Sequence, residues 1–463
     1  MTTKILVPVL AFTGVVVAVM QTLLVPVLKD LPQLLDTAPG NTSWVITSTL
    51  LSGAVATPVT GRLGDLYGKR RMLIVSLAVM VAGSLVSALT SDLIPMITGR
   101  ALQGLAMGAI PLGIGLMRDL LPEEELGSAM ALMSSSLGVG GSLALPAAAL
   151  VAQHADWHVL FYGAAGLGAV CTVLTIVVVP ESPARARGSF DVLGAIGLSA
   201  GLVLFLLPVS RAGDWGWTSG RTLGLFAAAA VVLALWAVLE LRLAAPLVDL
   251  RTTVRPAVLL TNLASIAVGA SFLVVSLVLP QLLQLPKVTG YGLGQPMVVA
   301  GLLMTPLGLT MMGTAPVHAR LSARYGPKGT LILGMVIIAA GYGAGLGLLS
   351  APWQSLVLVV VLGAGIGLAY SSLPALIVAA VPVSETGAAN GLNTLMRSIG
   401  AALSSAVVGA VLTSTANESM LPSLQGFRLS FLFAAGAMAV GLVAAVLLPK
   451  SRQASKRERA LSM

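Results

Sequence analysis

Two arginines of this sequence lie inside long apolar segments, where a charged side chain is rare. They are Arg100, in the segment 93–117, and Arg397, in the segment 388–413. A guanidinium inside a membrane span is costly, and it therefore indicates a function by default, such as a proton path or a contact with a substrate. For Arg100, the alternative is a structural role in which backbone carbonyls accept its hydrogen bonds. The other polar points of such segments are the amides Gln21, Asn262 and Asn393.

Carboxylates are absent from the places where ion coupling would most readily use them. None of the 17 acidic residues falls at the middle of an apolar segment. A buried carboxylate is a natural site for proton exchange and for a lipophilic cation. Its absence argues against a simple exporter of many cations and favours neutral or anionic apolar molecules. Asp30, Asp65 and Glu240 remain as titrating candidates for proton coupling.

Three other patterns that could do chemistry are better explained without it. His154 and His158 are spaced as metal ligands, but we expect a solvated pair at a helix start. The glycines of 138–141 and 363–367 lie inside apolar segments without the strand–helix context of a nucleotide loop, so they indicate packing. The single Cys171 allows neither a disulfide nor a cysteine-rich metal site. With no catalytic constellation, we expect no enzyme, no metal and no cofactor.

Composition identifies the surroundings that these residues need. Of 463 residues, 57% are hydrophobic and 9% are charged, and the mean hydropathy is +0.97. A soluble domain has about 25% charged residues, so a soluble enzyme and a disordered chain are both excluded. The net charge of +9 could suggest nucleic acid, but basic residues in a membrane protein mark cytoplasmic loops. We therefore expect a lipid bilayer, and not nucleic acid, as the partner.

The apolar runs predict fourteen membrane-spanning helices, since each span needs about 20 apolar residues. The chain contains 51 Gly and 25 Pro, which membrane helices tolerate and which permit close helix contacts. The first run lacks a small-residue cleavage site, so we expect it to be retained as the first helix. The predicted spans are about 5–28, 44–61, 72–90, 93–117, 127–151, 158–180, 191–209, 222–241, 257–280, 296–317, 330–349, 353–381, 388–413 and 427–448.

The basic residues predict the orientation of these spans. If the N-terminus is cytoplasmic, the inner segments hold 19 of the 26 Lys and Arg residues and the outer segments hold 5. Such an excess of positive charge marks the cytoplasmic side. We therefore expect a multi-pass protein of the plasma or inner cell membrane, with both termini in the cytoplasm.

An internal repeat relates the two ends of the chain. The segment 62–68 recurs as 320–326, with Arg, Leu, Tyr and Gly matched at an offset of 258. Pro122 and Glu125 recur at an offset of 260 as Pro382 and Glu385. The order of the matches pairs spans that are eight apart, which indicates two six-helix halves with two helices inserted between them. Such parallel repeats are typical of a transporter that alternates access.

The segment 61–71 resembles the loop between helices 2 and 3 of the major facilitator superfamily. Its sequence is Gly61-Arg62-Leu63-Gly64-Asp65-Leu66-Tyr67-Gly68-Lys69-Arg70-Arg71, and Leu66 stands where a basic residue is usual. Within the superfamily, the chain is similar to the fourteen-helix drug:proton antiporters. The resemblance implies a latch that holds the two halves together in one state, with Arg118 as the partner of Asp65. The residues of this latch are Gly61, Arg62, Asp65, Gly68, Arg70 and Arg118.

Other segments extend the resemblance over almost the whole chain. Arg100-Ala101-Leu102-Gln103-Gly104 is similar to the motif of the fourth helix, which implies a role in proton coupling or in the substrate path. The segment 127–151 keeps Gly141 and Pro146, the implied hinge, although Leu145, Ala149 and Leu150 replace three glycines. Val17 stands where many relatives that export cationic drugs have an aspartate. The residues assigned to proton coupling or to the substrate path are Arg100, Gln103, Gly104, Gln21, Asn262, Asn393 and Arg397.

We therefore expect an all-α integral membrane protein with the major facilitator fold. Its predicted parts are an N-terminal six-helix bundle (1–180), two inserted helices (181–255), a C-terminal six-helix bundle (256–449) and a basic cytoplasmic tail (450–463). The predicted function is secondary active transport by a monomer, which exports small hydrophobic drugs or secondary metabolites in exchange for protons. The alternatives are a lipid or metabolite carrier of the same fold, including an importer, and a membrane sensor or scaffold that does not transport.

Overall fold

A computed structural model shows how the described residues of the chain fold. These residues are 3–24, 27, 30–183, 185–186, 188–243, 246–416 and 421–449, and they form helices and loops without a strand. The predicted tail 450–463 lies outside them. The all-helical class is therefore confirmed for the part of the chain that the structure describes.

The helices follow one another with short connections. The N-terminal part contains α1 (Thr3–Thr22), α2 (Leu31–Leu34), α3 (Pro39–Tyr67), α4 (Lys69–Ala88), α5 (Leu93–Leu105), η2 (Ala106–Gly108), α6 (Ala109–Leu120), α7 (Glu123–His154) and α8 (His158–Val178). The middle part contains α9 (Val192–Trp215), α10 (Gly220–Arg242) and α11 (Leu250–Thr253). The C-terminal part contains α12 (Pro256–Gln284), η3 (Lys287–Thr289), α13 (Met297–Gly313), α14 (Ala315–Gly345), α15 (Pro352–Ala380), η4 (Val383–Glu385), α16 (Thr386–Ser414) and α17 (Leu424–Leu447).

Twelve stretches of the described residues are long and apolar enough to cross a membrane. Two features separate this number from the fourteen predicted spans. The 29-residue helix α3 is not among the twelve, and the 49-residue stretch Met297–Gly345 counts once although its backbone leaves the helical conformation at Gly326. The multi-pass character is confirmed, and the number fourteen stays a prediction.

The internal repeat has a matching backbone feature. Gly68, between α3 and α4, has φ +112°, and Gly326, inside α14, has φ +75°. The two glycines are 258 residues apart, as the sequence repeat requires. Positive φ strains any residue with a Cβ, so each glycine permits the chain to break one helix and begin the next.

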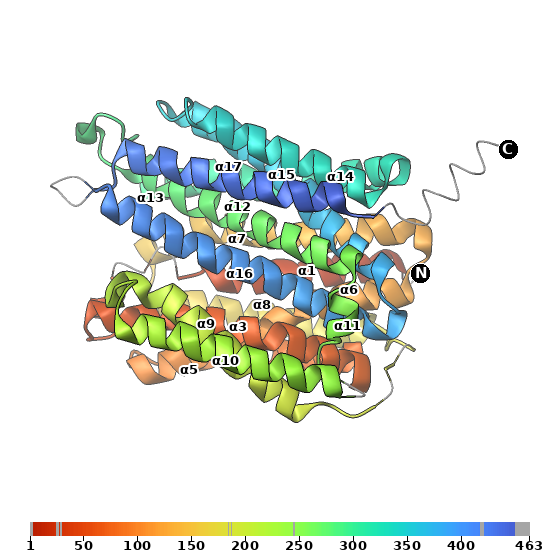
Figure 1. The fold of residues 1–463 in the computed structure, drawn as a ribbon. Helices are drawn as coiled ribbons and strands as arrows, with labels where there is room; N and C mark the ends of the chain where they lie inside the picture. The colour runs from red at the N-terminus through yellow and green to blue at the C-terminus, as the bar shows by residue number, and fades with distance from the viewer. Residues whose placement is uncertain are drawn as a thin grey trace.

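The long helices run side by side and gather into two groups (Figure 1). One hydrophobic core lies mainly within the N-terminal part, and a second core is built by α12 to α17. The helices α14, α15 and α17 lie on one side of the molecule, and α3, α5, α9 and α10 lie on the other. Helix α1 begins and α17 ends at the same end of the bundle, which we call the gate end.

The middle helices form a hairpin at the periphery. Helix α9 packs on α3 from the N-terminal part and on α16 from the C-terminal part, and it shares a third hydrophobic core with them. Only 17% of the apolar window of α10 is buried, and its exposed side chains include Val231 and Leu235. A large apolar surface of this kind needs a membrane or another protein to cover it. The three-part division of the chain stays a prediction that these separate cores favour.

The two glycines provide a test of the helix breaks. We expect Gly326→Ala and Gly68→Ala both to lower the melting temperature of the purified protein, since strained backbone costs about 1–3 kcal/mol. Gly68→Ala should have the larger effect, because its Cβ would lie 2.9 Å from a Glu181 carboxylate oxygen, whereas nothing lies within 4 Å at Gly326. Thermal unfolding in detergent measures the melting temperatures of both variants. Equal melting temperatures for the two variants would contradict this account of Gly68.

Candidate functional site

The carboxylate of Asp65 lies at the contact between the two groups of helices. Asp65 is in the last turn of α3, and its side chain is fully buried. It accepts hydrogen bonds from the backbone N–H groups of Gly387 (3.1 Å) and Ala388 (2.9 Å), at the start of α16. Negative charge is stabilised at a helix N-terminus, where the backbone donors have no partner inside the helix. Asp65 therefore caps a helix that belongs to the opposite end of the sequence.

Lys69 completes the charge balance around Asp65. Its buried ammonium lies 3.3 Å from the Asp65 carboxylate and 2.7 Å from that of Asp119. Arg118, the predicted partner of Asp65, forms no direct ion pair with it in the described part of the chain, where the carboxylate of Asp65 pairs with Lys69. Arg118 instead donates to the carbonyls of Val381 (3.0 Å) and Pro382 (3.3 Å) and to Thr386 Oγ1. A cation at the C-terminal end of α15 is favourable, so Arg118 also joins the two groups, by another contact.

Glycines allow α3 and α16 to approach this closely. A Cβ on Gly61 would lie 2.3 Å from the carbonyl oxygen of Gly387, and a Cβ on Gly391 would lie 2.5 Å from that of Thr57. Gly61 therefore belongs to the contact for a steric reason. Arg70 does not cross between the groups, since it donates to Ile176 O (2.6 Å) and binds Glu181 Oε1 through its backbone N–H (3.1 Å).

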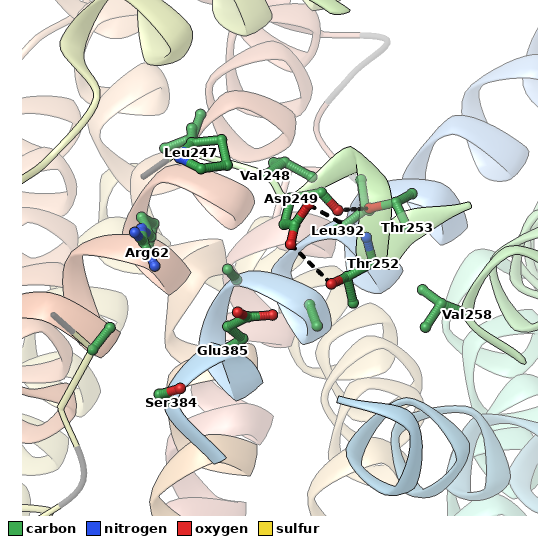
Figure 2. A pocket seen from close by; sticks show the side chains of 14 residues that line it. Arg62, Leu247, Val248, Asp249, Thr252, Thr253, Val258, Ser384, Glu385 and Leu392 are labelled. Atoms are coloured by element: carbon green, nitrogen blue, oxygen red, sulfur yellow. Dashed lines mark hydrogen bonds between the residues drawn. The ribbon is translucent and has the colours of Figure 1, made fainter. Parts of the chain in front are cut away.

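A cavity of about 190 Å³ lies beside this contact (Figure 2). Arg62 faces it from α3, Asp249 from the start of α11, and Glu385 from η4. Asp249 also caps α11, since its carboxylate accepts from the backbone N–H of Arg251 and from Thr252 Oγ1. The cavity therefore joins both groups of helices and the linker that follows the inserted hairpin.

Arg100 is buried at the centre of the N-terminal group, and its guanidinium has several acceptors. It donates to Met20 O (2.9 Å), Val45 O (3.4 Å) and Gln103 Oε1 (2.7 Å). Gln103 in turn donates to Ser84 Oγ (2.8 Å). Arg100 and Gln103 thus tie α5 to α1, α3 and α4. Two other predicted residues lie nearby: Gly104 approaches the carbonyl of Thr49, and Gln21 in α1 has a buried Nε2 with no hydrogen-bond partner among the described residues.

A second polar cluster lies between α12 and α16. Asn393 Nδ2 donates to Asn262 Oδ1 (2.9 Å) and to Ser265 Oγ (2.7 Å). Arg397 lies one turn further along α16, and it donates to Thr394 Oγ1 (3.0 Å). The structure therefore brings together residues that are separated by up to 135 positions in the sequence, namely Asn262, Asn393 and Arg397.

Of the two residues of the predicted hinge in α7, one lies at a close helix contact and the other does not. A Cβ on Gly301 of α13 would lie 3.1 Å from the backbone nitrogen of Pro146, so Pro146 lies at a close crossing. A Cβ on Gly141 would have its nearest neighbour at 3.8 Å, an ordinary distance. The crowded glycines are Gly138, whose carbonyl lies 2.3 Å from a Cβ built on Gly308, and Gly140, where a Cβ would lie 2.3 Å from Val15 O.

The histidines with metal-like spacing are engaged otherwise. His154 Nδ1 lies 3.0 Å from the carbonyl of Leu150, and the backbone N–H of His158 donates to Asp156 Oδ1 (2.8 Å). This N–H, and then the His158 ring, lower the pKa of the Asp156 carboxyl. No group of three or more metal-ligating side chains occurs in the described part of the chain.

Two buried residues were missed by reasoning from the sequence. His318 in α14 is fully buried, and neither ring nitrogen has a hydrogen-bond partner among the described residues. Tyr370 in α15 lies under Arg397, with the guanidinium carbon 4.9 Å from its ring centre. Tyr370 lies inside the predicted span 353–381 and His318 directly follows the span 296–317, so a polar residue in or beside an apolar run was the available signal.

Comparisons with known proteins agree with this architecture. The family model described as Major Facilitator Superfamily matches residues 10–405 and 262–463. The tetracenomycin C resistance and export protein of Streptomyces glaucescens is 29% identical over 391 residues, which cover 81% of this chain and 69% of that protein. The multidrug resistance protein Stp of Mycobacterium tuberculosis is 26% identical over 404 residues, which cover 86% of this chain and 74% of that protein.

Two solved structures have a similar fold. The proton:xylose symporter XylE matches with a TM-score of 0.67 and 13% identity, covering 96% of this chain and 95% of that one. The human organic anion transporter MFSD10 matches with a TM-score of 0.65 and 14% identity, covering 95% of this chain and 98% of that one.

The contact between α3 and α16 can be tested sterically. We expect Gly61→Ala to weaken it by about 1–3 kcal/mol, the usual cost of overpacking. In a Cys171→Ser background, spin labels at Ser128→Cys and Val383→Cys should then report longer distances across the gate end. Gly127→Ala is the control, because nothing lies within 4 Å of a Cβ there. Unchanged distances in Gly61→Ala would show that this contact does not close the gate end.

The charge of Asp65 can be tested with the same labels. Asp65→Asn keeps the size of the side chain but removes a charged acceptor from the start of α16, at a cost of about 1–3 kcal/mol. We expect the population with a separated gate end to rise severalfold or more. Asp36→Asn serves as the control, since Asp36 is exposed and its φ of +43° suits asparagine. Identical distance distributions for Asp65→Asn and the parent protein would refute the latch.

Proposed function

The chain belongs to the major facilitator superfamily, and from this premise we propose that it exports small hydrophobic compounds by alternating access. It is a multi-pass membrane transporter and not an enzyme. The proposal concerns the direction, the substrate class and the energy source. The proposal also includes a monomeric protein in the plasma or inner cell membrane, with its gate end in the cytoplasm.

One observation carries the proposal most directly: two of the contacts across the gate end are separable polar pairs. Asp65 binds two backbone N–H groups of α16, and Arg118 binds carbonyls at the end of α15. Each partner could exchange these bonds for bonds to water when the gate end opens. A net contribution of about 1.5–3 kcal/mol per charged hydrogen bond is small enough for such a contact to form and break during a transport cycle.

The names of the relatives support export. The proteins of Streptomyces glaucescens and Mycobacterium tuberculosis are described as an export protein and as a multidrug resistance protein. A hydrophobic compound reaches such a protein readily, because it concentrates in the bilayer around the exposed apolar helices.

The buried polar residues favour neutral or anionic substrates. The helices α12, α15 and α16 contain no Asp or Glu, whereas Arg397 and three asparagines are buried among them. A lipophilic cation would find no carboxylate there, and it would meet the positive charge of Arg397.

Proton coupling is the proposed energy source. The candidate groups are Asp65, Glu240, Asp30 and the buried His318. His318 is the one fully buried histidine, and its two ring nitrogens have no hydrogen-bond partner among the described residues.

Flux in everted membrane vesicles tests direction and coupling together. We expect an aromatic fluorescent probe to enter vesicles that contain the protein when their interior is acidic, because export from a cell corresponds to uptake by an everted vesicle. Collapsing the pH gradient should reduce this uptake at least severalfold. Vesicles without the protein are the control. Undiminished uptake would refute antiport, and uptake restricted to a labelled phospholipid would identify a lipid carrier instead.

A further inference from the structure

The two arginines that lie inside spans differ in how their charges are satisfied. The guanidinium of Arg100 has three hydrogen-bond acceptors, two of them backbone carbonyls. The guanidinium of Arg397 donates to Thr394 Oγ1, and its Nη1 is buried without a hydrogen-bond partner among the described residues. Both side chains are more than nine-tenths buried. Arg100 therefore has the partners of a structural arginine, and Arg397 lacks them.

The positive charge of Arg397 has no carboxylate beside it. Within 4.0 Å, the acidic residues of the described chain pair with Lys69, His158 and Arg211, but not with Arg397. The three helices around Arg397 contain no acidic residue that could move toward it. A buried cation without a counter-charge is strongly destabilising unless something supplies one.

Aromatic and amide groups lie near this guanidinium. The ring of Tyr370 lies 4.9 Å from it, and the ring of Phe272 lies 5.8 Å from that of Tyr370. Asn393 lies four residues before Arg397, on the same face of α16, and its Oδ1 also lacks a hydrogen-bond partner among the described residues. The cluster thus offers one charged donor, one amide and two aromatic faces.

The backbone holds this cluster in a fixed place. A Cβ on Gly269 of α12 would lie 2.1 Å from the carbonyl oxygen of Arg397, so α12 and α16 meet without an intervening side chain. Gly400 makes a similar crossing with Ile266 O, at 2.0 Å. The guanidinium is therefore carried by a rigid helix pair, as a binding group requires.

We propose that Arg397 binds an ionised acidic oxygen of an aromatic substrate, such as a carboxylate or a phenolate. The substrate supplies the missing negative charge to Nη1, while its ring packs beside Tyr370 and Phe272 and its neutral polar groups bind Asn393. Tyr370 also holds the guanidinium by a cation–π contact. This inference rests on the proposed export of hydrophobic compounds and names the acidic aromatic ones as the preferred class.

Binding to the purified full-length chain in detergent tests the inference separately from transport. The probes are anthracene-2-carboxylate and its neutral amide, which share one ring system. We expect the parent protein to bind the carboxylate about tenfold or more tightly than the amide, because a hydrogen bond between charged groups is strong. Arg397→Gln should bring the two affinities together by weakening the carboxylate alone, and Arg397→Lys should restore part of the preference.

Arg221→Gln is the matched control, because Arg221 also lies on an aromatic ring, 3.8 Å from that of Trp215, but in an exposed position. It removes the same charge from the molecule and should leave the preference unchanged. If Arg397→Gln does not fold, Arg397→Lys decides, since a loss of preference of several fold is expected from its single ammonium donor. A parent protein that binds both probes equally, or neither, overturns the inference, as does a preference that is undiminished in Arg397→Gln or, where that variant does not fold, in Arg397→Lys. Vesicle uptake of a neutral probe would still stand in that case, so the two proposals fail separately.

Discussion

The Asp65 carboxylate caps α16 and so joins the two groups of helices, and we propose that closure of the gate end depends on this contact. A buried carboxylate needs strong partners, and Asp65 has two backbone N–H groups from α16 and the ammonium of Lys69. The backbone donors belong to a helix that follows more than 300 residues later, so this single side chain satisfies two parts of the chain at once. The close packing of Gly61 on Gly387 brings the carboxylate within reach. Glycine spacing and charge therefore act at the same contact.

The two copies of the internal repeat share a backbone feature at the gate end but differ in their charged residues. Gly68 and Gly326 have equivalent positive φ values, so both halves break a helix in the same way. The position that corresponds to Asp65 is occupied by Ala323, and Pro327 stands in place of Lys69. Only the first copy can therefore provide this carboxylate. The inserted hairpin adds to the difference, since α9 packs across α3 and α16.

The buried polar residues also differ between the two groups of helices. In the N-terminal group, Arg100 and Gln103 form a closed network that ties four helices together. In the C-terminal group, Asn393 and Arg397 keep buried polar atoms without partners among the described residues. A satisfied network stabilises a fold, and an unsatisfied one is the usual mark of a place where a ligand or a proton acts.

The sequence by itself determined the membrane setting, the helical class, the repeat and the residues of the segment 61–71. Hydropathy and glycine spacing are local properties, which the bilayer and the backbone impose directly. It also indicated Arg100 and Arg397 as unusual, but it could not distinguish them. Only the tertiary structure decided that Asp65 binds α16 and Lys69 instead of Arg118, and that Gly138 and Gly140 are crowded while Gly141 is not. Apart from the ammonium of Lys69, these partners are backbone N–H and C=O groups, which every residue carries and which no sequence pattern marks. Their positions exist only once the helices have packed.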